Sequence, residues 1–455
     1  MAEIMPFRGV LYAPEKIGDL NKVMAPPYDV ISPRLQDDLY ARHSNNIVRL
    51  ELNKITDQDS EGNDRYSRAG RLLAKWLADG DIKQDARPSI YYYTQTYALK
   101  SGLEQTRKGF VSLVRLEDFG KGIHPHERTL SGPKADRFKL MTSTDANLSC
   151  IFSLYSEPLL DVNKLLEAAV KGKKPYIDVK DDDKVENRLW RIDDVELIKK
   201  VQANMRNKAL FIADGHHRYE TALNYRNMMC EKTGGNTGNE PFNFVMMYFS
   251  NMDDVGMTIW PTHRVVHSVK GFERASFLER CGEYFDVDET PYGSDNEEEA
   301  KAAFLKKLES KGKQAVTFGL HLRGKSSFLL LTLKEKDMMD RVFGNAMPDV
   351  FKGLDVTVLH SLILTKILGL TREAQEKQEN LVYVKSYAEA LKAAKEGANQ
   401  MVFLLNPTKI EQVKAVAETG QVMPQKSTYF YPKLLSGLVI NIIGSESGAL
   451  TSSSA

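Results

Sequence analysis

The sequence has few cysteines, no excess of charge of either sign and no long apolar run. Its 455 residues contain three cysteines and no C-x-x-C pair, which argues against a disulfide framework and a cysteine zinc site. Lys and Arg number 62 against 61 Asp and Glu, so a surface that coats nucleic acid is not expected. The longest apolar stretch, 356–370, contains His360 and Lys366 and is shorter than the roughly 20 residues of a membrane span. With no signal peptide recognised at the N-terminus, these absences predict a globular cytoplasmic protein without a membrane partner.

Several motifs that mark common chemistries are also missing. The chain has neither a G-x-x-x-x-G-K-[ST] loop nor a G-x-G-x-x-G fingerprint. It lacks H-E-x-x-H and G-x-S-x-G as well. Any phosphate site in this chain must therefore use a helix N-terminus and side chains rather than a P-loop.

The order of helical and strand patterns predicts a mixed α/β protein. The length predicts about three domains or two large ones. We expect an N-terminal α/β region packing on a core, the core itself, a C-terminal α/β region and a disordered tail, at 1–105, 106–265, 266–443 and 444–455. The clearest expected elements are a helix, the two arms of a hairpin and a closing apolar strand, at 63–78, 90–99, 106–116 and 437–443.

The strongest local signal is a strand that runs directly into a polar helix start. Residues 209–213 form a short apolar run typical of a buried strand, and Asp214 and Gly215 follow it. The next helix opens with His216, His217 and Arg218, where unpaired N–H groups and the positive end of the helix dipole favour an anion. This pattern predicts a phosphate-binding corner. The alternative is that Asp214 only caps the helix and the histidines are solvated.

A second polar segment, 123–137, combines histidines, a glutamate and several cations. Glu127 is the candidate general base for a hydroxyl nucleophile, beside His124 and His126. Positive charge around them comes from three residues, namely Arg128, Lys134 and Arg137. The alternative is a polar loop that leads into a capped helix, with Thr129 and Ser131 as caps.

Two further segments mix polar and aromatic residues. In 426–433, the side chains of Lys426, Ser427 and Thr428 are weak substrate-binding candidates. Aromatic segments of this kind more often pack on a core, and that alternative is the favoured one here. In 25–32, Asp29 is the main acid–base candidate.

Four motifs in fixed order carry a resemblance to a known family. They are A-P-P-Y-D-V-I-S at 25–32, P-H-E-R-T-L-S-G-P-K-A-D-R at 125–137, A-D-G-H-H-R-Y-E-T-A at 213–222 and M-P-Q-K-S-T-Y-F-Y-P-K at 423–433. Together they resemble the family called domain of unknown function 1015, over nearly the whole chain. That family name carries no activity.

A wider resemblance links the strand, the His-Glu loop and the Asp-Gly-His-His-Arg turn to the ParB/sulfiredoxin fold, in which this turn holds nucleotide phosphates. Sulfiredoxin has a cysteine where this chain has His216, so its chemistry is not implied. The free-serine kinases are the most similar variant. The resemblance implies that Glu127 is the base, assisted by His126 and Asp214, that 214–218 hold phosphates, and that Asp214 helps to place Mg²⁺ brought with ATP or ADP.

These observations support three hypotheses. The first is a phosphotransferase that moves phosphate from a nucleotide to a small hydroxyl-bearing metabolite, with free L-serine as the implied acceptor. The second is a nucleotide-binding regulator without turnover. The third is a metal hydrolase that uses the four histidines of the two motifs, although adjacent side chains on a helix diverge. The oligomeric state is left open.

Overall fold

The computed structural model describes residues 2–99, 101–127 and 131–444, and the chain divides into two compact units. Unit 1 comprises 1–125, 129–258 and 432–455, and unit 2 comprises 126–128 and 259–431. Unit 1 is therefore discontinuous in sequence. Both units mix helices and sheets, which confirms the expected fold class. The four regions expected from the sequence stay a prediction, and the tail expected at 444–455 lies outside the described residues except for Gly444.

Unit 1 is built around a nine-stranded sheet in the order β6-β11-β8-β12-β5-β4-β10-β9, with β1 also paired to β5. The pairs β11–β6 and β12–β8 are parallel, and the others are antiparallel. The strands of this sheet are β1 (Ile4–Met5), β4 (Ile90–Ala98), β5 (Glu104–Arg115), β6 (Ile123–His124), β8 (Ile151–Tyr155), β9 (Ile177–Lys180), β10 (Glu186–Ile192), β11 (Leu210–Asp214) and β12 (Phe244–Asn251). The hairpin expected at 90–116 is confirmed as β4 and β5.

Side-chain caps begin α2 and α4 of unit 1. Ser32 caps α2, Asp64 caps α4 with a capping box, and Gly80 in the left-handed region ends α4. The unit contains α1 (Pro14–Ile17), α2 (Pro33–Arg42), α3 (Val48–Glu51), α4 (Arg65–Asp79), α5 (Ser131–Thr144), α6 (Asp161–Val170), α7 (Val195–Met205) and α8 (His216–Thr233), with the short 3-10 turns Leu20–Lys22, Tyr28–Val30 and Pro241–Asn243.

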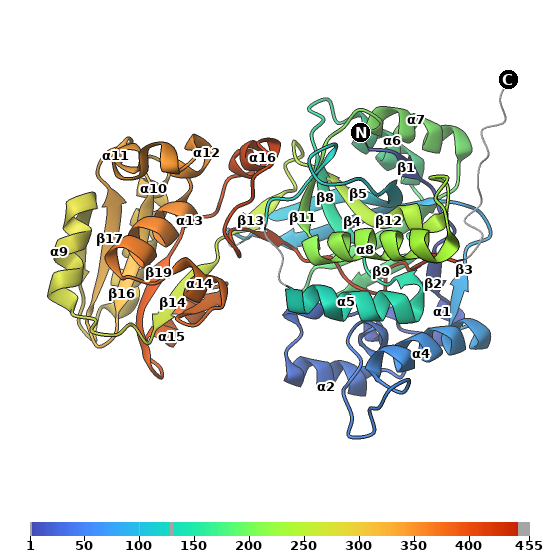
Figure 1. Cartoon of the computed structure of the whole chain (residues 1–455), viewed down its shortest axis with the longest axis horizontal. Helices are drawn as coiled ribbons and strands as arrows, with labels where there is room; N and C mark the ends of the chain where they lie inside the picture. The colour runs from blue at the N-terminus through green and yellow to red at the C-terminus, as the bar shows by residue number, and fades with distance from the viewer. Residues whose placement is uncertain (1, 100, 128–130, 445–455) are drawn as a thin grey trace. The chain divides into compact units, whose positions relative to one another are not determined.

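Three helices of unit 1 pack side by side, with α5 between α4 and α8 (Figure 1). The contact between α4 and α5 is close because Gly70 has no side chain. A Cβ at Gly70 would lie 2.1 Å from the carbonyl oxygen of Ser143. Glycine is therefore required there by the packing of the helix backbones rather than by its own conformation.

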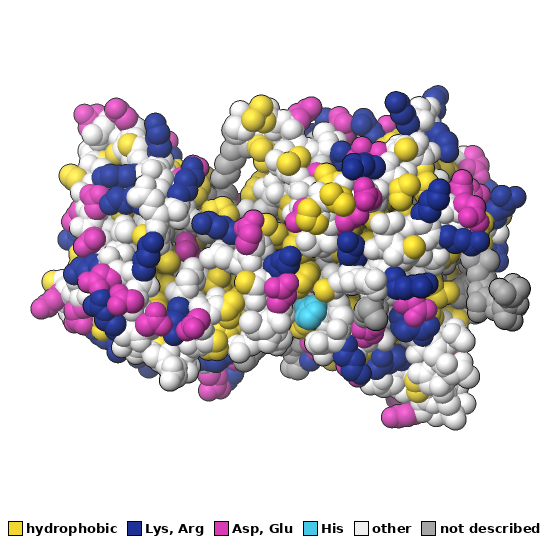
Figure 2. Space-filling model, turned by 90° about the horizontal axis from the view of Figure 1, so that it is seen from above, with side chains coloured by type: hydrophobic (Ala, Val, Ile, Leu, Met, Phe, Trp, Pro, Cys, Tyr) yellow, Lys and Arg dark blue, Asp and Glu magenta, His cyan; other side chains and the backbone are white. Residues whose placement is uncertain are grey.

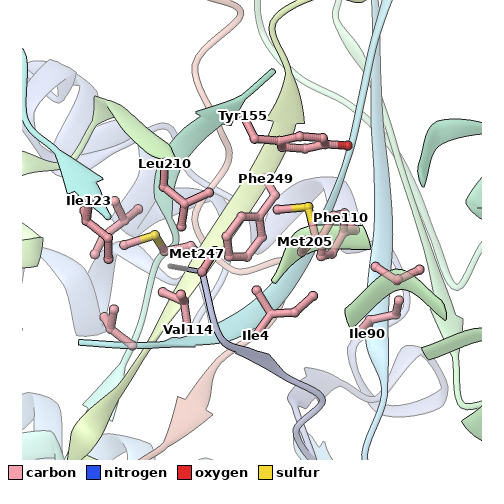
Figure 3. Close-up of a cluster of buried hydrophobic side chains, with 14 of the residues drawn as sticks. Ile4, Ile90, Phe110, Val114, Ile123, Tyr155, Met205, Leu210, Met247 and Phe249 are labelled. Atoms are coloured by element: carbon pink, nitrogen blue, oxygen red, sulfur yellow. The ribbon is translucent and has the colours of Figure 1, made fainter. Parts of the chain in front are cut away.

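One hydrophobic cluster of unit 1 lies on one face of the sheet. Figure 3 shows side chains from several strands and α7 meeting there, among them Ile4, Phe110, Met205, Met247 and Phe249. These residues are almost fully buried, and Phe110 and Phe249 stack with ring centroids 5.0 Å apart. Alternation along the strands sends Phe152, Tyr248 and Val111 to the opposite face.

The final segment of unit 1 differs from the expected strand at 437–443. Only β21 (Asn441–Ile442) is a strand, and it pairs with β7 (Ala146–Asn147). The segment before it bonds to other parts of the chain, since Ser436 pairs with Ala25 and Ile440 pairs with Val10 of β2 (Val10–Tyr12), which itself pairs with β3 (Ile82–Gln84). Successive residues thus use different partners, and Gly437 has a φ of 95°, so no single ladder forms.

Unit 2 contains a six-stranded antiparallel sheet in the order β15-β17-β16-β19-β14-β18. Helices α10 and α15 pack on it through Phe304, Leu308, Ala390 and Leu391. The strands of the unit are β13 (Thr258–Trp260, whose first residue belongs to unit 1), β14 (His263–His267), β15 (Phe285–Pro291), β16 (Thr317–Leu322), β17 (Ser327–Leu333), β18 (Leu381–Val384), β19 (Asn399–Leu404) and β20 (Tyr429–Tyr431).

The helices of unit 2 include an unusual π-helical stretch at Leu359–Ile367, within the apolar run noted in the sequence. The others are α9 (Arg274–Tyr284), α10 (Glu297–Gly312), α11 (Met338–Phe343), α12 (Asp349–Lys352), α13 (Asp355–Val358), α14 (Arg372–Glu376), α15 (Tyr387–Ala394) and α16 (Ile410–Glu418), with a 3-10 turn at Gly344–Ala346. Across the described residues, no helix has both the length and the apolar character that a membrane span requires.

Charged side chains of both signs are interspersed on the face of the protein that Figure 2 shows. This mixing agrees with the near-equal totals of acidic and basic residues in the sequence. The concentration of positive charge described below is a buried feature of unit 1.

Candidate functional site

The turn between β11 and α8 forms as the sequence predicts, with one correction. Strand β11 ends at Asp214, and α8 begins at His216. The N-cap is Gly215, which has a φ of 90°, so the interpretation of Asp214 as a mere helix cap is wrong. A Cβ at Gly215 would lie 3.0 Å from the Arg218 guanidinium, and glycine therefore suits both the conformation and the close approach.

The Asp214 carboxylate lies between two cations. Lys433 Nζ donates to Oδ1 at 2.6 Å, and an Nη of Arg218 donates to Oδ2 at 2.9 Å. Arg218 also donates to Ser149 Oγ at 3.2 Å and to the carbonyl oxygen of Cys150. Burial would raise the pKa of Asp214, but the charges of Lys433 and Arg218 outweigh it and hold the pKa well below its usual range. The carboxylate is thus ionised at neutral pH.

A third cation, Arg107 of β5, belongs to the same part of unit 1. It donates to Gln95 Oε1 and, at 2.5 Å, to the carbonyl oxygen of Pro432, the residue before Lys433. Its Cζ lies 4.6 Å from the ring centroid of Phe152, which is the cross-strand partner of Asp214. Arg107 is 1% exposed and makes no ion pair within the described ranges. Sequence reasoning missed it because a lone arginine in a strand carries no motif.

The other predicted phosphate-binding residues of unit 1 have partners of their own. Arg137 forms a buried ion pair with Glu51 at 3.0 Å and another with Asp136 at 2.6 Å. Lys134 pairs with Glu220 of α8 at 2.7 Å. These contacts give Arg137 and Lys134 a structural role in unit 1, and their assignment to phosphate stays a prediction.

A cavity of about 50 Å³ is lined by both Arg137 and Arg218. Its lining also includes Glu51 and Thr221, which are each more than 95% buried. Within the described residues, Glu51 Oε1, Thr221 Oγ1 and Arg218 Nε have no hydrogen-bond partner. Three such atoms around one cavity of this volume are what a small cluster of buried waters would satisfy.

The two histidines of the α8 motif differ in burial. His216 is 7% exposed, and its charge adds to those that lower the pKa of Asp214. His217 is half-buried. The interpretation of both histidines as solvated surface residues is therefore wrong for His216. Asp29 lies exposed in the 3-10 turn Tyr28–Val30 of the same unit.

In unit 2, the residues of the His-Glu loop contact the segment that precedes β20. His126 is fully buried, and its Nε2 lies 2.8 Å from Thr428 Oγ1. Its carbonyl oxygen accepts from the N–H of Met423 at 2.7 Å. Glu127 Oε1 accepts from the N–H of Lys426 at 3.1 Å. Two segments far apart in sequence, both named as candidates, therefore lie side by side.

The same segment has two further features. Lys426 has a φ of 57°, a conformation that is strained for a lysine. Its carbonyl oxygen accepts from buried Arg264 at 3.1 Å. Ser427 is 3% exposed, and its hydroxyl donates to the carbonyl oxygen of Pro424, which indicates a structural role. Arg128 and Thr129 lie outside the described residues.

The predicted metal ligands do not assemble. Among 2–99, 101–127 and 131–444, no group of three or more His, Cys, Asp or Glu side chains is placed to hold a metal ion. Both oxygens of Asp214 already accept from cations, which does not fit a direct contact with Mg²⁺. The side chain of Asp214 therefore does not fit the expected role in placing Mg²⁺, and the described residues provide no ligand cluster for the histidine-based hydrolase.

The sheet of unit 1 and its buried, cation-rich turn define a mixed α/β protein with a corner suited to an anion. The chain belongs to the family described as protein of unknown function DUF1015, whose model matches residues 4–357. This confirms the family resemblance, with the first three motifs inside the matched residues and the fourth, at 423–433, outside them, while the link to the ParB/sulfiredoxin fold stays a prediction. No curated protein matches the chain.

Several solved structures share a limited similarity with the chain. A free serine kinase variant in complex with AMP is 12% identical, with 70% of this chain and 87% of that chain covered and a TM-score of 0.33. A conserved hypothetical protein from Pyrococcus furiosus is 14% identical, with 73% and 95% covered and a TM-score of 0.33. C-terminally truncated SbnI from Staphylococcus aureus is 10% identical, with 74% and 90% covered and a TM-score of 0.35. Similarity at this level does not define an activity, so the function has to be argued from the residues.

Proposed function

We propose that the protein is a small-molecule phosphotransferase, which moves a phosphoryl group from a nucleotide to a hydroxyl group. The observation that carries this proposal is the buried turn of unit 1, where Arg218 and Lys433 share the carboxylate of Asp214 and Arg107, bound to the carbonyl oxygen of Pro432, forms no ion pair within the described residues. An excess of buried positive charge is stable only with an anionic partner. Phosphate groups supply that partner, and free L-serine is the acceptor that the motif resemblance implies.

Phosphoryl transfer mainly requires positioning and neutralisation of charge. In this proposal, Arg218 and Lys433 bind the phosphate oxygens together with the first N–H groups of α8, and Gly215 leaves room for their approach. By the motif resemblance alone, Glu127 is the base that accepts the proton of the acceptor hydroxyl, whose oxygen forms the new bond to phosphorus as the bond to the nucleotide oxygen breaks. The contact of Glu127 with the N–H of Lys426 orients its carboxylate.

The test is a turnover assay with the full chain. ATP and ADP, each as the magnesium salt, are incubated with a panel of amino acids and other small alcohols, and products are identified by mass spectrometry. We expect a phosphorylated alcohol with the wild-type protein and a loss of at least about 100-fold with Glu127→Gln, in the range of general base catalysis. Glu389→Gln, an exposed glutamate of unit 2, is the matched control and should retain full activity.

Two results would overturn the proposal. One is full activity of Glu127→Gln. The other is nucleotide binding without any product across the panel, which would favour a nucleotide-dependent regulator. A cytoplasmic location, expected from the sequence, gives such an enzyme access to nucleotides and to free metabolites.

A further inference from the structure

Arg107 is a buried arginine without a carboxylate partner in the described chain. Its Nη2 is engaged by Gln95 and Pro432, but Nε and Nη1 are buried and have no hydrogen-bond partner within those residues. An arginine keeps its charge in a protein interior. Burial of an uncompensated charge is strongly unfavourable, so this guanidinium points to a counter-charge supplied from outside the chain.

The position of Arg107 in the sheet relates it to Asp214. Arg107 is four residues from Val111 on β5 and therefore shares its face of the sheet. From Val111, cross-strand pairing runs through Tyr248 and Phe152 to Asp214 on the same face. The stacking of Arg107 on Phe152 places its charge beside the strand that pairs with the end of β11.

A polar row across three strands fixes Arg107 and, through it, Lys433. Asn187 of β10 pairs with Gln95 of β4, which pairs with Arg107 of β5. Gln95 Nε2 donates to the Asn187 side chain at 3.0 Å and to the carbonyl oxygen of Lys433 at 2.9 Å. Arg107 also donates to the carbonyl oxygen of Pro432, so this row binds the carbonyl groups of two consecutive residues, Pro432 and Lys433. The backbone that carries Lys433 is thereby fixed, and its amine reaches Asp214.

The charges of this part of unit 1 do not balance. Asp214 pairs with Arg218 and Lys433, whereas Arg107, bound to the residue before Lys433, forms no ion pair within the described residues, so its charge is left uncompensated. We propose that Arg107 is a specificity-determining residue whose uncompensated charge makes this site selective for ligands with two or more linked phosphate groups over ligands with one. The inference rests on the proposed nucleotide-binding function and adds the number of phosphate groups that the site prefers.

The test measures binding, so it does not depend on turnover. Calorimetry with the full chain compares ADP with AMP, which differ by one phosphate group. We expect ADP to bind wild-type protein at least about tenfold more tightly than AMP, because its second phosphate group brings further negative charge to the uncompensated charge of Arg107. Arg107→Gln can still donate a hydrogen bond to Pro432 but carries no charge. It should weaken the binding of ADP about tenfold and the binding of AMP clearly less. Arg107→Lys should restore the preference.

Gln95→Leu separates charge from positioning. It removes the bonds of Gln95 to Arg107 and to the carbonyl oxygen of Lys433 but keeps the charge of Arg107, so it should weaken the binding of ADP and of AMP by the same factor. If Arg107→Gln also weakens both ligands equally, Arg107 is only structural and the proposal is wrong. If wild-type protein binds AMP as tightly as ADP, or binds neither, the proposal is wrong whether or not the variants fold. A preference for ADP without any phosphorylated product would overturn the proposed enzyme and leave this inference standing.

Discussion

Replacement of Asp214 by Asn tests the electrostatic account of the site most directly. The carboxylate accepts charged hydrogen bonds from Lys433 at 2.6 Å and from Arg218 at 2.9 Å, and the three side chains are 20%, 14% and 13% exposed. Removal of one partner from a buried ion pair costs about 3–5 kcal/mol, because it leaves charge without compensation. At about 2–4 °C per kcal/mol, we expect Asp214→Asn to lower the unfolding temperature of unit 1 by about 6–20 °C.

The assay can be confined to unit 1 by tryptophan fluorescence. Trp76 and Trp190 belong to unit 1 and Trp260 to unit 2, so a Trp260→Phe background reports the unfolding of unit 1 alone. Asp182→Asn is the matched control, because Asp182 forms an ion pair with Arg42 at 3.0 Å but is 65% exposed. A shift for Asp214→Asn no larger than that of the control would refute the reasoning.

Added phosphate and changes of pH should alter the difference in unfolding temperature between Asp214→Asn and the wild type. Without the carboxylate, inorganic phosphate becomes the available counter-charge, and it should stabilise Asp214→Asn more than the wild type. The folded-state pKa of Asp214 is lowered below the unfolded value, so its contribution to stability is present above about pH 4 and is lost as the pH falls further. The difference in unfolding temperature between wild type and variant should therefore be constant near neutral pH and narrow below about pH 4.

Two further variants test the packing of unit 1, with thermal unfolding as the measurement. Gly70→Ala places a Cβ against the backbone of Ser143 and should destabilise by about 1–3 kcal/mol or more, whereas Gly282→Ala, with nothing within 4 Å, should be neutral or slightly stabilising. Arg137→Met leaves Glu51 as an unpaired buried charge and should cost about 3–5 kcal/mol, while addition of Glu51→Leu should recover part of that loss. Additive effects of the two substitutions would contradict this account of the pair.

Local features of the fold could be predicted well from the sequence. The helix expected at 63–78 depends on neighbouring residues, and the structure has it as α4, Arg65–Asp79. The strand and helix on either side of Gly215 could be found for the same reason, since an apolar run and a polar helix start are local patterns. Pairing across long distances is different: the last apolar segment has the composition of a strand, but its residues bond to several partners and only Asn441 and Ile442 form one.

The candidate site could be predicted only in part, for the same physical reason. Asp214 and Arg218 are four residues apart, and the tight turn at Gly215 between β11 and α8 brings them into an ion pair. The contact of Lys433 with Asp214 spans 219 positions, and no local pattern indicates which cation occupies that place. Arg107 is found only when strand register and burial are known, because alternation along β5 sets its face and Gln95 sets its partner. Arg137 shows the converse: it lies within a motif and is predicted to bind phosphate, but in the structure it forms ion pairs with Glu51 and Asp136.

The discontinuity of unit 1 affects how the chain can fold as it is synthesised. Arg107 and the carbonyl group of Pro432 are 325 positions apart. At about 5–20 residues per second, the ribosome needs roughly 15–65 s to synthesise the residues between the two. Arg107 of β5 therefore lacks its contact with Pro432 until all of unit 2 has been synthesised. During that time, water can hydrate the polar side chains of Asn187, Gln95 and Arg107. An apolar row exposed in the same way would instead associate with other chains. A nascent chain therefore acquires the lysine of this site only as its final segment emerges, and an incomplete product that ends before residue 432 lacks that cation altogether.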